Sequence, residues 1–219
     1  MSELKHIAGL VNIIGLPNAG KSTLMNALIG QKLSIVTAKA QTTRHRIMGI
    51  LNGDDYQIVY SDTPGVLDPK YKLHEGMMKA VGSALTDADL ILMVIDSSDR
   101  TPFHASTLEK IKKMDVPIFV VLNKLDLVGN ESADGLFQFW QNELPHAKIY
   151  PVSALTYLYT KELLQKIIEV LPPSPPFFPK DELSDRTQRF FCSEIIREKI
   201  LKYYNKEIPY SCEVQIESF

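Results

Sequence analysis

Between Ile7 and Leu171 the chain alternates short β-branched apolar runs with segments of helical periodicity. The runs at 90–96 and 117–123 are almost wholly apolar, which is typical of parallel strands covered on both faces. The turn sequence "NGDD" separates two further runs and predicts a hairpin, and hence one antiparallel edge strand. This alternation predicts an α/β fold with a mostly parallel six-stranded sheet. Strands are expected at 9–15, 46–51, 56–62, 90–96, 117–123 and 147–153, and helices at 21–30, 73–88, 133–144 and 159–171, with one more before the strand at 117.

The character of the chain changes after Leu171. We place a first domain at 1–171, a proline-rich linker at 172–189 and a second unit at 190–219. The linker prolines prevent helix formation and predict a stiff spacer, so the first domain should be independent of the tail. The tail predicts one helix and then a strand at 211–218, but about thirty residues cannot bury a core alone. Five apolar residues share the predicted inner face of that helix: Ile195, Ile196, Ile200, Leu201 and Tyr204.

Composition narrows the class of protein further. Apolar residues make up 45% of the 219, enough for a sizeable core, and the net charge of −2 argues against a chain that is basic throughout. Cys192 and Cys212 have no metal or redox spacing and suit a reducing compartment. The apolar run near the N-terminus is too short for a membrane span and lacks the pattern of a secretory signal. We therefore expect a soluble, cytoplasmic protein.

The strongest motif follows the first predicted strand and opens a helix. Gly15, Gly20, Lys21 and Ser22 fit the phosphate-binding pattern G-x-x-x-x-G-K-S. Glycines there let backbone N–H groups approach phosphate oxygens, and the helix N-terminus adds a positive dipole end. Lys21 is expected to reach the β- and γ-phosphates, and the Ser22 hydroxyl to bind Mg²⁺. The alternative is that residues 15–22 form an ordinary glycine-rich connecting loop without a bound phosphate.

Two later motifs indicate which base is bound. "NKLD", Asn123 to Asp126, follows a strand at the sheet edge where ligands bind. The Asp126 carboxylate can accept from guanine N1–H and its amino group, whereas adenine offers no such donor pair. Asn123 could brace the phosphate loop, and the stem of Lys124 could cover the base. The small residues of 153–155 let backbone N–H groups approach guanine O6.

Two further segments suit Mg²⁺ and the γ-phosphate. In "SDTPG", Asp62 is placed to hold Mg²⁺ through water and the Gly65 N–H to contact the γ-phosphate. In "QTTRHR" a threonine could close over Mg²⁺, and Thr43 is preferred to Thr42. Together these loops predict a switch that is ordered by GTP and released on hydrolysis.

These motifs, in this order and spacing, resemble the bacterial Era GTPases, and "QTTRHRI" is the most specific of them. The resemblance continues into "SEIIREKILKYYNKEIPYSCEVQIE", which is similar to the opening of the KH-type RNA-binding domain that follows the GTPase domain in Era. It implies a GTPase that assists small ribosomal subunit assembly, binds the 3′ end of small-subunit ribosomal RNA, and contacts the inner membrane peripherally. We also expect a monomer, although the sequence itself does not give the oligomeric state.

The chain departs from the patterns of related families in two respects, one catalytic and one concerning RNA binding. Val66 stands where Ras-type proteins carry a water-orienting glutamine, which predicts slow turnover, as in Era relatives. Asn18 either holds K⁺ near the phosphates, as in related GTPases, or merely favours the tight turn. The tail contains no Gly-x-x-Gly loop, the RNA clamp of a KH domain, and is slightly acidic. We therefore expect a chain truncated within its KH domain, whose RNA contact needs the complete domain.

The expected site residues fall into three groups. The expected ligands are GTP or GDP and Mg²⁺, with K⁺ as a further ligand if Asn18 binds it. The alternatives to an Era-like GTPase are a GTP-dependent scaffold with incidental hydrolysis and a related GTPase of tRNA modification. The catalytic candidates are Lys21, Thr43, Gly65 and Asn18. The metal candidates are Ser22, Thr43 and, through water, Asp62. The nucleotide candidates are Gly15, Leu16, Pro17, Asn18, Ala19, Gly20, Lys21, Ser22, Thr23, Asp62, Thr63, Pro64, Gly65, Val66, Asn123, Lys124, Leu125, Asp126, Ser153, Ala154 and Leu155.

Overall fold

The computed structural model describes residues 6–69, 72–99, 101–204 and 212–218. Its centre is a six-stranded sheet in the order β2-β3-β1-β4-β5-β6, in which only the β2–β3 pair is antiparallel. This confirms the predicted α/β class, the six strands and the antiparallel edge. The strands are β1 (Ile7–Gly15), β2 (Ile47–Asn52), β3 (Tyr56–Asp62), β4 (Leu90–Asp96), β5 (Ile118–Asn123) and β6 (Lys148–Pro151).

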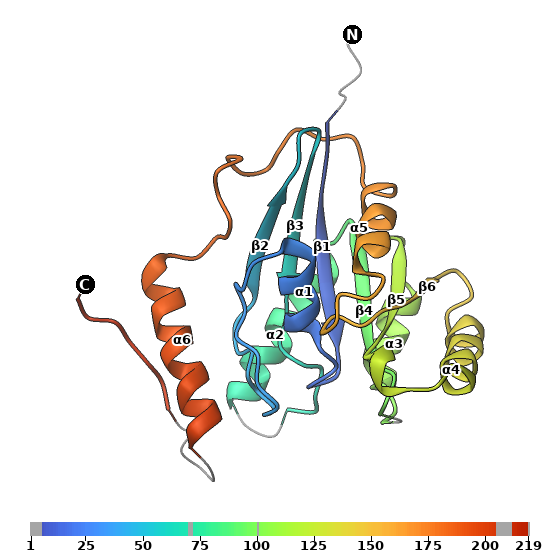
Figure 1. Cartoon of the computed structure of the whole chain (residues 1–219), viewed down its shortest axis with the longest axis horizontal. Helices are drawn as coiled ribbons and strands as arrows, with labels where there is room; N and C mark the ends of the chain where they lie inside the picture. The colour runs from blue at the N-terminus through green and yellow to red at the C-terminus, as the bar shows by residue number, and fades with distance from the viewer. Residues whose placement is uncertain (1–5, 70–71, 100, 205–211, 219) are drawn as a thin grey trace.

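Helices cover both faces of the sheet (Figure 1). Helices α1 and α5 pack on one face, where Leu24, Met25, Leu163 and Ile167 join the larger apolar core. Helices α2, α3 and α4 lie on the other, where Trp140 fills the second core. The helices are α1 (Lys21–Ile29), α2 (Lys72–Thr86), α3 (Ala105–Lys112), α4 (Asn130–Glu143), α5 (Thr160–Ile168) and α6 (Gln188–Tyr203), with a 3₁₀ turn η1 (Leu125–Leu127).

The proline-rich segment does not act as a free spacer. It leaves α5, crosses the end of the sheet and runs along the open edge of β2 before α6 begins (Figure 1). Ile50 N–H donates to Leu183 O at 2.9 Å, and Ser184 Oγ donates to Met48 O at 2.5 Å. An exposed strand edge presents unpaired backbone groups, and this segment pairs several of them. The predicted independence of the first domain from the linker and tail is therefore wrong.

The buried side chain of Gln57 holds the proline-rich segment against β3 by hydrogen bonds. Its side chain is fully buried on β3, and Oε1 accepts from the N–H groups of Phe177 and Phe178 at 2.7 and 2.9 Å. Its Nε2 donates to Phe178 O at 2.8 Å and to Asn52 Oδ1 at 2.7 Å. All of the hydrogen-bonding capacity of this buried amide is thus used, as burial of a polar group requires.

Two predictions about the tail are wrong. Of the α6 residues expected to be buried together, Ile195, Ile196 and Tyr204 are exposed, whereas the predicted burial of Leu201 is confirmed. The buried face otherwise carries Glu194, Arg197 and Glu198. Within 212–218 no strand forms, and the Cys212 carbonyl instead accepts from Arg44 Nη1 at 2.8 Å. A strand needs a neighbouring strand, and alternation in the sequence cannot supply one.

Gln57→Ala should destabilise the protein by about 2 kcal/mol, because it removes the buried amide that accepts from the N–H groups of Phe177 and Phe178. Urea unfolding monitored by circular dichroism measures this change. The control is Gln141→Ala, which removes one exposed bond of 3.3 Å and should cost less than about 0.5 kcal/mol. Equal midpoints for the two variants would show that Gln57 does not fasten the segment.

Candidate nucleotide site

The phosphate loop joins β1 to α1 and needs glycine at its end. Gly20 has φ +94°, in the left-handed region, and a Cβ there would lie 2.2 Å from Asn123 Nδ2. Any side chain would therefore meet both backbone strain and a steric clash. The helix α1 begins at the next residue, so its N-terminal N–H groups face the loop, as an anion site requires.

Lys21 lies inside this loop. Its Nζ donates to Leu16 O at 2.8 Å and to Gly15 O at 3.1 Å, both within the phosphate loop itself. Burial lowers the pKa of Lys21 to about 8, while the charge of Asp62 opposes that change. A cation held at the centre of a glycine loop is placed to neutralise phosphate charge.

Three oxygen-bearing side chains from three segments meet beside Lys21. Ser22 Oγ donates to Asp62 Oδ2 at 2.6 Å, and Thr43 Oγ1 lies 3.0 Å from Ser22 Oγ and 3.4 Å from Asp62 Oδ2. Burial raises the pKa of Asp62, although hydrogen bonding from Ser22 and the charge of Lys21 oppose it. The other carboxylate oxygen, Asp62 Oδ1, is buried without a protein partner. A cluster of hard oxygens with an unpaired buried carboxylate atom fits Mg²⁺.

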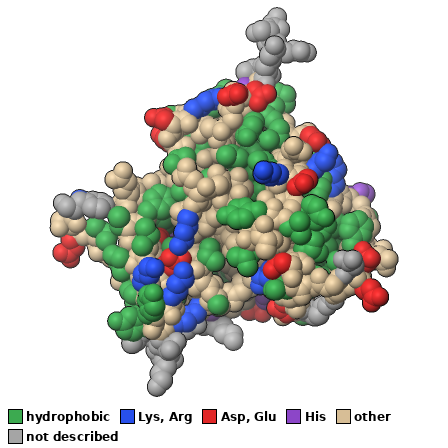
Figure 2. All heavy atoms as spheres, in the orientation of Figure 1, with side chains coloured by type: hydrophobic (Ala, Val, Ile, Leu, Met, Phe, Trp, Pro, Cys, Tyr) green, Lys and Arg blue, Asp and Glu red, His purple; other side chains and the backbone are tan. Residues whose placement is uncertain are grey.

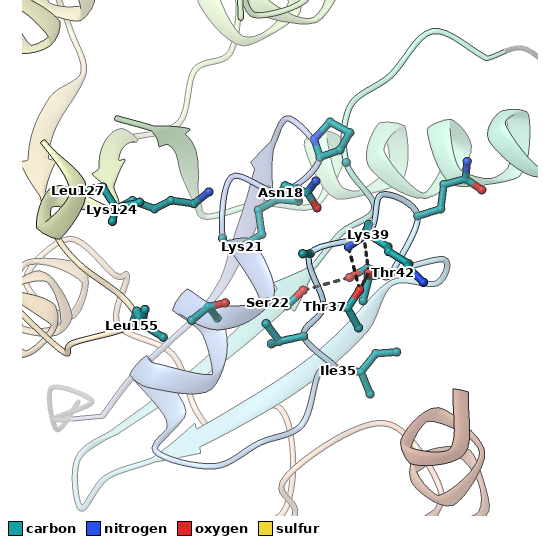
Figure 3. A pocket seen from close by; sticks show the side chains of 18 residues that line it. Asn18, Lys21, Ser22, Ile35, Thr37, Lys39, Thr42, Lys124, Leu127 and Leu155 are labelled. Carbon is teal, nitrogen blue, oxygen red and sulfur yellow. Dashed lines mark hydrogen bonds between the residues drawn. The ribbon is translucent and has the colours of Figure 1, made fainter. Parts of the chain in front are cut away.

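The geometry also separates the two candidate threonines. Thr42 Oγ1 points back into its own loop, where it lies 2.6 Å from both Thr37 Oγ1 and Lys39 O (Figure 3). Thr43 points instead to Ser22. The structure therefore favours Thr43 as the metal-binding threonine of this segment.

Asn123 ties the phosphate loop to the base-binding loops. Its side chain is 2% exposed; Nδ2 donates to Ala19 O at 2.9 Å, and Oδ1 accepts from Ala154 N–H at 3.0 Å. The neighbouring Lys124 has φ +62°, and its Nζ pairs with Asp96 at 2.5 Å, which holds the side-chain stem in place. Asp126 lies exposed on η1 at the same end of the sheet.

Gly65 and Val66 close the site from the end of β3. A Cβ at Gly65 would lie 2.7 Å from the backbone of Pro17, so only glycine allows the two loops to approach this closely. Val66 N–H donates to Gly15 O at 3.0 Å, and the Val66 side chain is 2% exposed. Asn18, in the phosphate loop opposite, is exposed with φ +61°, a conformation that asparagine tolerates better than most residues.

These loops surround a cavity of about 590 Å³, within the usual range for a small-molecule site (Figure 3). Asp62, Asn123 and Asp126 are not among its lining residues; Asp62 and Asn123 lie buried behind the wall. Ten of the predicted residues line it: Pro17, Asn18, Gly20, Lys21, Ser22, Thr23, Thr43, Gly65, Lys124 and Leu155. Sequence reasoning missed the wall formed by 35–39 and Leu127, because that segment has no motif and no periodic pattern.

Comparison with known proteins assigns the family. The model of a family described as "50S ribosome-binding GTPase" matches residues 10–124. GTPase Era of Syntrophus aciditrophicus is 40% identical over 213 residues, which span 97% of this chain and 70% of that protein. GTPase Era of Clostridium kluyveri is 41% identical over 212 residues, which span 96% of this chain and 72% of that protein. The chain belongs to the Era family of GTPases.

Solved Era structures share the fold closely. Era in complex with MgGDPNP and nucleotides 1506–1542 of 16S ribosomal RNA superposes with a TM-score of 0.89 at 36% identity, over 94% of this chain and 70% of that one. An Aquifex aeolicus Era variant bound to GDP and AlF₄⁻ gives 0.88, also at 36% identity, over the same shares of the two chains. The resemblance inferred from the sequence is thus confirmed.

Asp126→Asn should weaken GTP binding at least tenfold and improve binding of XTP, because an amide suits xanthine and no longer accepts from guanine N1–H and its amino group. Competition against a fluorescent guanine nucleotide measures both. Asp134→Asn is the control, since Asp134 is an exposed carboxylate on α4 and should change neither affinity. If ATP competes as well as GTP with the unaltered chain, the assignment of the base site is wrong.

Proposed function

We propose that this chain is a GTP-hydrolysing switch of the Era type, which acts with small-subunit ribosomal RNA in assembly of the small ribosomal subunit. The observation that carries the proposal is the meeting of the phosphate loop, the Ser22–Thr43–Asp62 cluster and the Asn123-braced loops around one cavity. Support for the RNA partner comes from the Era relative solved with a 16S ribosomal RNA segment.

In the proposed reaction, water attacks the γ-phosphorus of GTP, the bond from that phosphorus to the β–γ bridging oxygen breaks, and GDP and inorganic phosphate are released. The loop N–H groups and Lys21 neutralise the charge that moves onto the bridging oxygen. The hydroxyls of Ser22 and Thr43, with Asp62 through water, would hold Mg²⁺, which supplies further charge stabilisation when bound. The Gly65 N–H orients the γ-phosphate.

The same geometry predicts slow turnover. Val66 is aliphatic and buried, so its side chain cannot orient the attacking water. Hydrolysis then depends on backbone groups and bound cations. This favours a switch with a long-lived GTP state over a rapid enzyme, and a single-turnover rate separates it from a scaffold that does not hydrolyse GTP at all.

The proposal places the chain in the bacterial cytoplasm, where ribosomal subunits assemble. Within the described residues, no helix is long and apolar enough to cross a membrane. Peripheral contact with the inner membrane stays a prediction.

Single-turnover hydrolysis of GTP should be faster in KCl than in NaCl at equal ionic strength, and Asn18→Ala should remove the difference. The physical reason is that the Asn18 amide oxygen lies at the mouth of the phosphate loop, where a K⁺ ion would add positive charge near the phosphates. Radioactive phosphate release measures both rates. The control is Asn142→Ala, an exposed asparagine on α4.

Equal rates in the two salts would leave Asn18 as a turn residue only. A complete absence of GTP hydrolysis by the unaltered chain, with Mg²⁺ present, would instead contradict the proposed function itself.

RNA binding by this chain should be weak, with a shallow dependence on salt. Figure 2 shows only a small group of Lys and Arg side chains on the α6 side of the face drawn, with an acidic side chain among them. Phosphate neutralisation supplies most non-specific affinity, and few cations gather here. The sequence also contains no glycine after Gly135, and hence no Gly-x-x-Gly clamp beyond it.

Filter binding of an oligonucleotide that copies the 3′ end of small-subunit ribosomal RNA measures this affinity, with the Clostridium kluyveri Era as the positive control. Tight and sequence-selective binding by the present chain would show that its RNA site lies on the GTPase domain or the linker.

A further inference from the structure

The face of α6 that lies against the rest of the protein carries three charged residues beside the apolar Leu201. Glu194, Arg197 and Glu198 are 6%, 4% and 2% exposed, whereas the apolar Ile195 and Ile196 face outward. Buried charges cost free energy unless they are paired and hydrogen-bonded. Glu194 pairs with Arg197 on the same helix, and both Arg197 and Glu198 also bind residues within 32–44, the segment that follows α1 and forms one wall of the nucleotide cavity.

Arg197 makes the contact nearest to the cavity. Arg197 donates two hydrogen bonds to the Glu194 carboxylate, from Nε to Oε1 at 2.7 Å and from Nη2 to Oε2 at 2.6 Å. The same Nη2 also donates to the backbone carbonyl of Thr42 at 2.5 Å. This two-point contact fixes the orientation of the planar guanidinium. It thereby directs Nη2 toward the Thr42 carbonyl in the wall of the cavity.

The carbonyl of Thr42 belongs to the peptide unit that leads into Thr43. A peptide is planar, so fixing that carbonyl fixes the orientation of the N–H and Cα of Thr43. Thr43 Oγ1 in turn lies 3.0 Å from Ser22 Oγ, in the oxygen cluster that suits Mg²⁺. A continuous chain of contacts therefore runs from α6 to the metal-binding hydroxyl.

Glu198 makes a second contact with the same segment, farther from the metal cluster. Its carboxylate accepts from Val36 N–H at 3.2 Å and pairs with Lys32 at 2.7 Å and Lys202 at 3.1 Å. These hydrogen bonds and ion pairs outweigh the effect of burial and lower the pKa of Glu198. The contact anchors the start of the segment and serves as a matched comparison for Arg197.

We propose that Arg197, oriented by Glu194, is a positioning residue that holds Thr43 in place for Mg²⁺ and the γ-phosphate. The first helix after the linker thus contributes to the GTP-bound state of the nucleotide site. This inference rests on the proposed GTPase function. A purely structural ion pair would hold α6 in place and affect GDP and GTP alike, whereas a positioning residue affects only the state in which Thr43 binds the metal.

The test compares affinities for the non-hydrolysable analogue GDPNP and for GDP, each with Mg²⁺ and with EDTA. Arg197→Ala should weaken GDPNP binding in Mg²⁺ about tenfold, as expected for loss of a charged hydrogen bond, and change GDP binding less than about twofold. The difference should vanish in EDTA. Arg197→Lys, which keeps the charge but loses the fork, should show the same pattern and serves if the alanine variant does not fold.

Three further measurements test whether Arg197 acts through Thr43. Glu198→Gln, on the same helix and equally buried, should weaken the two nucleotides by similar factors. Amide hydrogen exchange at 42–44 in the nucleotide-free protein should be faster in Arg197→Lys than in Glu198→Gln, which reports on the segment without any ligand. In a double-mutant cycle, Arg197→Ala should add little to the loss already caused by Thr43→Ala.

Equal weakening of GDP and GDPNP by Arg197→Ala, or full additivity with Thr43→Ala, would overturn the inference while leaving the GTPase function intact. Failure of the unaltered chain to bind either nucleotide would overturn the proposed function as well. The two outcomes are distinguishable, because the first is measured on the Arg197 variants and the second on the unaltered chain.

Discussion

One buried amide connects the loops of the nucleotide site. Asn123 donates to the phosphate loop at Ala19 and accepts from Ala154, and its Nδ2 occupies the space that a side chain at Gly20 would need. Asn123 can do this because β5 and β1 are parallel strands on either side of β4, so their carboxyl ends meet at one edge. The phosphate loop and the base loops therefore share one geometry, and neither can shift without leaving a buried polar group unpaired.

Most of the fold and the chemical residues of the site could be predicted from the sequence, because both depend on local signals. Continuous apolar runs, one hairpin turn and a glycine-rich loop before a helix each have a local physical cause. The cavity wall at 35–39 could not be predicted in this way. Its residues are positioned by tertiary contacts, such as the bonds from Leu33 and Ser34 N–H to Asn26 Oδ1, and no local pattern records them.

The tail shows a different limit of sequence reasoning. Helical periodicity states which residues share a face of α6, but not which face is buried. Ile195 and Ile196 were predicted to be inside because apolar residues usually are. Arg197 and Glu198 are inside instead, because their partners are a carbonyl at Thr42 and a lysine at position 32, more than 150 residues earlier in the chain. Such long-range pairing of charges leaves no trace in a single sequence.

The route of the chain after α5 has a mechanical consequence. The linker is bonded along β2, and α6 is bonded to the segment directly before β2, so both hold one continuous stretch of the GTPase domain. If that segment left its place while α6 stayed, Arg197 would lose the Thr42 carbonyl and Glu198 would lose Val36 N–H and Lys32, while Glu194 and Lys202 would still pair with them. Each lost hydrogen bond to a charged group costs about 1.5–3 kcal/mol. Movement of α6 together with the segment avoids that cost. The contacts of Arg197 and Glu198 therefore couple the position of α6 to that of residues 32–44.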